Sequence, residues 1–280
     1  MHNLLVALGL SISVAYGVTQ NYKSHHTAFP DNDLWVPAST EYSPQNEWDN
    51  GYQEEDYNKV LDTFYELYAP RIEALGGTFV IERDWIDGSV NAFSWKGGTQ
   101  YGIEIPGGMS RYELINEEAF ILVICHEMGH VLGGGPHRYG TSFEGQSDYF
   151  SSLKCMREVL PLLPRKDIPV FEDCNEAFDN MDELQTCSHT LKGALALSSL
   201  YARVERIPYP KIETPDPSVV SKTDRRHPSA QCRLDTVVAG ALCPADPSVD
   251  VSLEDPAQGA CVRPEFEKEA RPKCWYRPEL

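Results

Sequence analysis

The feature that most constrains the fold of this 280-residue chain is an apolar stretch that carries two histidines. The residue spacing predicts a helix from about Glu113 to Leu132. Residues 119–124 are apolar on every side of that helix, which is typical of a helix buried at the centre of a domain. The run Gly-Gly-Gly-Pro at 133–136 ends it. We therefore expect the rest of a domain to pack around this helix.

Shorter periodic segments lie on both sides of the central helix. Asp87-Gly88 and Gly97-Gly98 are turn signals between neighbouring antiparallel strands, and we expect the sheet to end at Pro106-Gly107-Gly108. The predicted class is an α+β fold with a small antiparallel sheet. The remaining predicted elements are helices over 52–75, 144–160 and 180–204 and strands over 78–85, 90–95 and 100–105.

Composition and the N-terminus restrict the environment of the protein. The formal charge of −18 argues against a nucleic-acid partner, and 41% hydrophobic residues argue against a disordered chain. Residues 1–17 are predicted to be a signal peptide, cleaved after Ala15 or Gly17. No other stretch has the roughly 20 apolar residues of a membrane helix, so we expect a soluble periplasmic or secreted protein.

The predicted organisation has three parts after the signal peptide. Residues 18–51 are expected to form an irregular arm, residues 52–206 the main domain, and residues 207–280 a cysteine-rich, loop-dominated segment that packs on that domain. We expect disulfides between Cys174 and Cys187 and among the four cysteines of the last segment, with the pairing there left open. Cys125 and Cys155 can be disulfide-bonded or free.

The central helix contains His126-Glu127-Met128-Gly129-His130, which matches the pattern H-E-x-x-H. Residues four apart share one helix face, so both imidazoles can reach a single Zn²⁺ ion. Glu127 is rotated by about 100° from His126 and can lie beside a water molecule at the metal. The alternative is a pair of histidines that only form hydrogen bonds at a helix end. The apolar helix and its glycine-rich end favour the zinc site.

Two residues compete for the place of third zinc ligand. His137 would resemble the extended metzincin pattern, but it follows His130 by seven residues where that pattern needs six. Glu144 is followed four residues later by Asp148, so Glu144 can bind zinc while Asp148 accepts the outer N–H of a ligating histidine. The glycine and serines after Glu144 allow close helix packing and favour it over a surface acidic pair.

These residues resemble those of the gluzincin metallopeptidases, and among them the HtpX and BepA type of CAAX-type peptidases. The similarity extends over residues 91–234, roughly half of the chain. The chain departs from the family in the short interval between His130 and Glu144, in the absence of the family's membrane helices, and in its cysteine-rich tail. The motifs that carry the resemblance, in the family's order, are Asn91-Ala92-Phe93, Gly107-Gly108, His126-Glu127-x-x-His130, Glu144-x-x-x-Asp148, His227-Pro228 and Arg233.

The resemblance implies a zincin-like domain with zinc held by two histidines and Glu144. It also implies that His227 and Arg233 lie over the metal, where His227 either donates a hydrogen bond in the transition state or binds zinc and keeps the enzyme latent. Without the resemblance, His227 would be an ordinary exposed loop histidine.

Together these features predict a zinc metalloendopeptidase that acts on polypeptide substrates in the cell envelope or outside the cell. Glu127 would take a proton from the attacking water, and the strand at 101–105 would be the sheet edge that pairs with substrate. The alternative is a non-catalytic binding or assembly protein whose structural zinc is closed by His227 or a cysteine. The oligomeric state and the natural substrate stay open.

Overall fold

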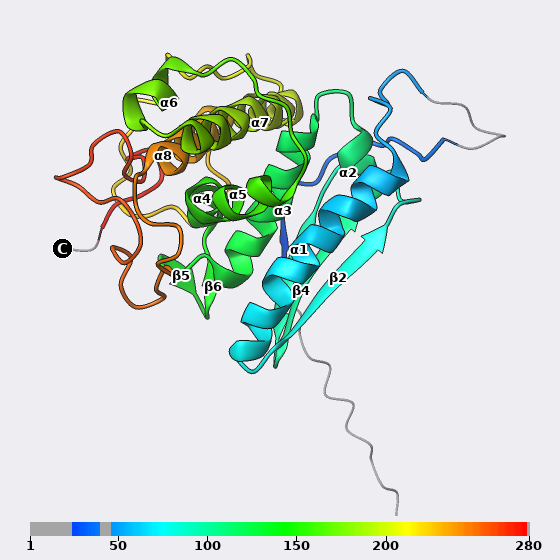
Figure 1. The fold of residues 1–280 in the computed structure, drawn as a ribbon, viewed down its shortest axis with the longest axis horizontal. Helices are drawn as coiled ribbons and strands as arrows, with labels where there is room; N and C mark the ends of the chain where they lie inside the picture. Colours follow the sequence, from blue (N-terminus) through cyan, green and yellow to red (C-terminus); the bar gives the residue numbers. More distant parts are fainter. Residues whose placement is uncertain (1–23, 40–45, 279–280) are drawn as a thin grey trace, which may run out of the picture.

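The computed structural model describes residues 24–39 and 46–278, which form a mixed α+β fold (Figure 1). The predicted signal peptide lies outside these residues. The elements in chain order are β1 (Ser24–Thr27), α1 (Glu54–Ala74), β2 (Thr78–Asp84), β3 (Phe93–Gly97), β4 (Gln100–Pro106), α2 (Gly107–Arg111), α3 (Glu117–Leu132), β5 (His137–Arg138), β6 (Thr141–Ser142), α4 (Glu144–Phe150), a π-helical turn (Ser151–Cys155), α5 (Met156–Val159), a 3₁₀ turn (Leu160–Leu162), α6 (Glu172–Ala177), α7 (Met181–Glu205) and α8 (Ala230–Leu242).

Helix α3 lies in the middle of the molecule, between the sheet and the helices α4 and α7 (Figure 1). All of its residues from Glu118 to Val131 are buried. Its first turn is capped by Asn116, whose side-chain oxygen accepts a hydrogen bond from the Ala119 amide at 2.8 Å. Gly134, with φ of +74°, turns the chain away after the last turn. The two histidines of the motif are therefore in the protein interior.

The sheet has the strand order β1-β3-β4-β2. The predicted antiparallel turn at Gly97-Gly98 is confirmed, because β3 and β4 pair antiparallel across it. The prediction that Asp87-Gly88 joins antiparallel neighbours is wrong, because β2 pairs with β4 in parallel. The carbonyl of Gly88 accepts from the Val36 amide at 2.7 Å and that of Asp87 accepts from the Gly108 amide at 2.8 Å. These bonds hold the segment in a connection that passes from one side of β4 to the other.

Two further expectations about the sheet are corrected by this order. The segment 101–105 is not an edge, because β4 lies between β3 and β2. The arm at 18–51 is not wholly irregular, because β1 pairs antiparallel with β3 from Ser24↔Lys96 to Thr27↔Phe93. The sequence Ser-His-His-Thr of β1 contains no apolar residue, so it shows no alternation by which a strand is recognised.

The predicted helix at 144–160 is interrupted, and the C-terminal segment contains a helix that was not predicted. The interruption is the π-helical turn between α4 and α5, where Gly240 of α8 comes so close that a Cβ there would lie 2.3 Å from Ser152 Oγ. Helix α8 packs against α4 and α7. Within residues 24–39 and 46–278, no helix has the length and apolar character that crossing a membrane requires.

All eight cysteines are paired. Two of the bonds lie in or near the helical core and two hold the C-terminal segment. Cys125, which the sequence left open, bonds Cys155 and ties α3 to the π-helical turn. The pairs are Cys125–Cys155, Cys174–Cys187, Cys232–Cys274 and Cys243–Cys261.

The contact between α3 and α4 depends on Gly129, because a Cβ on this residue would lie 2.7 Å from the Ser147 Cα. We expect Gly129→Ala to lower the free energy of unfolding by about 1–3 kcal/mol, since backbone must move to admit the methyl group. Gly97→Ala is the control, because nothing lies within 4 Å of its Cβ position. Denaturant unfolding of the oxidised proteins measures both, and equal stabilities would contradict the prediction.

Candidate metal centre

The three ligands predicted from the sequence lie together in the structure. His126 and His130 point from one face of α3, and Glu144 faces them from the first turn of α4. The two Nε2 atoms are 3.2 Å apart. Glu144 places its Oε2 3.4 Å from His126 Nε2 and its Oε1 3.6 Å from His130 Nε2. Ligand atoms bound tetrahedrally at the usual zinc distances lie about 3.3–3.6 Å apart. The observed separations lie in or close to this range, so the three side chains are placed to hold one zinc ion.

The outer nitrogens of both histidines are held by acceptors. His126 Nδ1 is 2.7 Å from Asp148 Oδ1, and His130 Nδ1 is 3.0 Å from the Ser142 carbonyl oxygen. Since a carbonyl only accepts, His130 carries its proton on Nδ1 and presents the Nε2 lone pair to the centre. Asp148 directs the neutral form of His126 in the same way. Two nitrogen lone pairs and a carboxylate therefore face one point, which suits a cation.

The charges at the centre are strongly perturbed. Burial opposes the ionised form of Glu144, but His130 and His126 outweigh it and hold the pKa of this carboxyl well below its usual value. Burial likewise lowers the pKa of His126, and the neighbouring Asp148 carboxylate overcomes this and raises it to about 9. The centre thus keeps Glu144 ionised, and His126 carries a balancing proton at pH 7 that a bound metal ion would displace from its Nε2.

Asp148 joins the candidate ligands to a buried arginine. Arg233 of α8 donates to both Asp148 oxygens, from Nε and from Nη2, at 2.8 Å each. Its Nη1 donates to the Ala28 carbonyl at 2.8 Å, and its guanidinium lies 3.8 Å from the centre of the Tyr201 ring. Arg233 is only 1% exposed, so its charge depends on these partners. Arg233 therefore acts on His126 through Asp148.

Glu127 is fully buried, and neither of its carboxylate oxygens has a partner with good hydrogen-bond geometry. Burial raises the pKa of Glu127 above its usual value, against the opposing effects of His130, His126 and the nearby Ser94 hydroxyl. A buried carboxylate without partners costs free energy, which indicates a function other than stability. A raised pKa is suited to a group that takes up and returns a proton near neutral pH.

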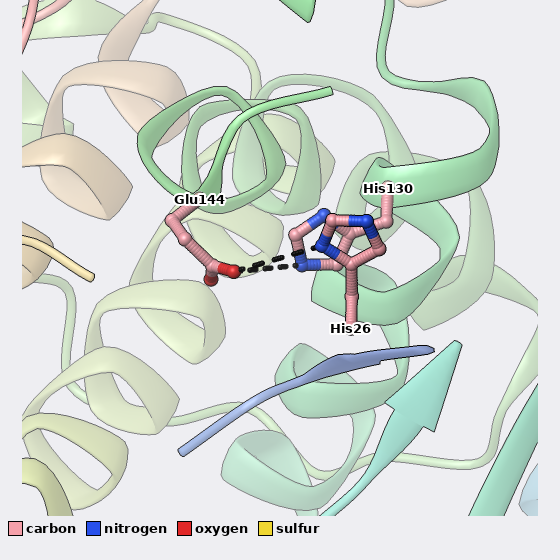
Figure 2. A group of neighbouring side chains, drawn as sticks. All are labelled: His26, His130 and Glu144. Atoms are coloured by element: carbon pink, nitrogen blue, oxygen red, sulfur yellow. Dashed lines mark ion pairs between the residues drawn. The ribbon is translucent and has the colours of Figure 1, made fainter. Parts of the chain in front are cut away.

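Two further histidines reach the centre. His227 Nε2 is 3.3 Å from Glu144 Oε2 and donates to the Thr27 carbonyl at 2.8 Å. His26 of β1 stacks on His130 with ring centres 4.5 Å apart, and its Nδ1 is 4.0 Å from Glu144 Oε1 (Figure 2). His26 was missed from the sequence, because it lies in an arm without any motif or periodic pattern.

His137, the competing third ligand, is not among these side chains. Its Nδ1 accepts a hydrogen bond from the Gly140 amide at 3.1 Å, within the short hairpin of β5 and β6. A second cluster of ligand-type residues, formed by Asp216, Cys232 and Cys274, has its two sulfurs joined in a disulfide. The structure therefore favours Glu144 over His137.

A cleft of about 610 Å³ opens beside the candidate ligands. Three of its side chains are cationic, although the whole chain carries a charge of −18. Within the described part of the chain, none of these three cations forms an ion pair; Arg225, for example, lies over the Phe143 ring at 5.4 Å. The lining includes His26, Glu144, Lys96, Arg138, Tyr139 and Arg225.

Two histidine nitrogens and one glutamate are a donor set that can hold a catalytic zinc ion and leave one position open. Comparisons of the chain with protein-family models, curated proteins and solved structures found no match.

Asp148→Asn tests how far the metal centre depends on the carboxylate behind His126. We expect zinc affinity to fall about 10–100-fold, because His126 loses the negatively charged partner that orients its ring. Competition with a chromophoric chelator measures the affinity, and Asp167→Asn, at an exposed position, is the matched control. Unchanged affinity in a folded Asp148→Asn protein would contradict this role.

Proposed function

We propose that this protein is a zinc-dependent metallopeptidase in which His126, His130 and Glu144 hold the metal. The observation that carries the proposal is the fully buried carboxylate of Glu127, which makes no well-formed hydrogen bond and lies one residue from a ligand of this closely spaced set. A zinc site that only supports the fold does not require such a group.

Bound zinc supplies Lewis acidity, which lowers the pKa of water and polarises a substrate carbonyl. Glu127 acts as general base and takes one proton of the attacking water onto a carboxylate oxygen. The water oxygen bonds to the carbonyl carbon, and the carbon–nitrogen bond of the peptide then breaks. Glu127 passes its proton to the departing amine nitrogen, so one water is consumed for each bond cleaved.

His227 and Arg233 have different roles in this proposal. His227 donates to a peptide carbonyl next to Glu144, so it can donate to the carbonyl oxygen of a substrate as negative charge develops there. Arg233 is engaged by Asp148 and the Ala28 carbonyl and acts as a positioning residue for His126. We therefore assign the oxyanion contact to His227 alone.

The alternative of a structural zinc is less well supported. It required a fourth ligand from His227 or a cysteine, and the cysteine form is wrong because every cysteine is in a disulfide. The same disulfides are consistent with a protein that works outside the cytoplasm, in the envelope or the exterior.

The cleft favours a peptide substrate with a carboxylate near the scissile bond. Lys96, Arg138 and Arg225 line it next to Glu144 and have no carboxylate partner among the described residues. In a chain of net charge −18, three cations without ion-pair partners beside one cleft favour the binding of a negatively charged ligand there. We therefore propose acidic polypeptides as the preferred substrates.

Glu127→Gln should abolish peptide hydrolysis and leave zinc bound, because glutamine keeps the shape and cannot take up a proton. Metal analysis together with casein hydrolysis measures both properties. A fully active Glu127→Gln protein would refute the assignment.

The matched comparison is Glu144→Gln, which should lose zinc, because the substitution weakens a ligand without changing the size of the side chain. The His137→Ala protein should keep its zinc. The opposite pattern, with zinc lost only in His137→Ala, would establish the metzincin-like site.

Replacing Lys96, Arg138 or Arg225 singly by Gln should lower kcat/KM for an acidic peptide about two- to fivefold relative to a neutral one, as expected for an exposed ion pair. The difference should shrink at high salt. Lys166→Gln, at an exposed position outside the cleft lining, is the control. Equal losses on acidic and neutral peptides would exclude charge selection by the cleft.

A further inference from the structure

Strand β1 covers the edge of β3 that adjoins the metal centre. It pairs with β3 along all four of its residues and is the outermost strand on that side of the sheet. Without β1, the outer strand would be β3, and an extended peptide could add to its open edge. An arm of the chain's own N-terminal region thus lies where a peptide substrate could pair.

The backbone of this arm is bound by side chains of the candidate active site. His227 donates to the Thr27 carbonyl and Arg233 to the Ala28 carbonyl, each at 2.8 Å. Asn91, just before β3, binds both backbone groups of Phe29, at 3.2 Å to its amide and 3.3 Å to its carbonyl. Side chains that recognise an extended main chain through its carbonyls are what a peptide-binding groove needs.

The arm also brings an imidazole to the metal centre. His26 rises from β1 toward His130 and Glu144 (Figure 2), and its ligand atom lies within 4.8 Å of theirs. An imidazole at this place can occupy the position that a catalytic zinc keeps open.

We propose that His26 is a fourth protein ligand of the metal and that β1 occupies the substrate's place on β3, so that the folded chain is a latent form. This inference rests on the proposed metallopeptidase function. A peptide substrate must displace β1, which at once uncovers the β3 edge, removes His26 from the metal and releases His227 from the Thr27 carbonyl.

The displaceable part is β1 itself. Its four residues include no apolar side chain, whereas Ala28 and Phe29, which follow it, are fully buried. Phe29 packs against Tyr201 with ring centres 4.6 Å apart, and Asn91 and Arg233 bind the backbone here. Release of β1 therefore loses a short ladder of hydrogen bonds, the His227–Thr27 bond and the contacts of His26, while the anchor at 28–29 keeps its core contacts.

The first test compares the full-length wild type with His26→Ala, with His137→Ala as the matched histidine control. We expect His26→Ala to lower zinc affinity about 10–100-fold, the size of effect typical when a supporting group of a metal site is lost. The visible absorption spectrum of the Co²⁺-substituted protein should change and should return toward that of wild type when imidazole is added. Hydrolysis should rise. Unchanged affinity and spectrum would overturn the ligand role of His26.

The second test measures amide hydrogen exchange of residues 24–27 in zinc-loaded wild type with and without a peptide hydroxamate. Exchange should rise when the hydroxamate binds, because it displaces β1. Binding without a change in exchange would overturn the substrate-like placement of β1.

The two proposals fail differently. If wild type binds zinc and Glu127→Gln is inactive, but His26→Ala matches wild type, only the latency proposal falls. If neither zinc nor Co²⁺ binds to wild type, both fall.

Discussion

The carboxylate of Asp148 is the group on which the arrangement of the centre depends. It orients His126 on α3 and balances the buried charge of Arg233 on α8, and Arg233 in turn holds the Ala28 carbonyl of the N-terminal arm. Removal of one partner from a buried ion pair costs about 3–5 kcal/mol, because the other charge stays uncompensated. One interaction therefore supports both the packing of three parts of the chain and the orientation of a candidate ligand.

That interaction is possible because neighbouring elements of the chain pack closely against helix α4. A Cβ on Gly145 would lie 2.3 Å from the Trp275 ring, and one on Gly129 would meet the backbone of Ser147. Small residues at these contacts bring the backbones close together. As a result, Glu144 and Asp148, one turn apart on α4, come within contact distance of the imidazole of His126. The spacing of the ligand atoms is thus a consequence of helix packing that glycine permits.

Most of the helical framework and the proximity of the three candidate ligands could be predicted from the sequence, because they follow from local patterns. Helical periodicity indicated α1, α3 and α7, and the pairs His126–His130 and Glu144–Asp148 each recur at four residues on one helix. Helix α8 had a similar signal in Leu234, Val237 and Ala241, which the surrounding prolines and cysteines obscured. The parallel pairing of β2 and the placement of His26 could not be predicted, since both depend on backbone partners distant in the chain.

The disulfides and the candidate metal centre use different side chains, so oxidation of the cysteines leaves the candidate ligands unchanged. Cys125 directly precedes His126, and Cys232 directly precedes Arg233, so two of the four disulfides adjoin residues of the centre. Cys125–Cys155 closes a loop with a sequence separation of 30, which stabilises the folded chain by about 3–4 kcal/mol in the chain-entropy model. Histidine and glutamate ligands have no thiol to oxidise. An oxidising environment can therefore form the covalent framework around the centre without consuming any of the candidate ligands.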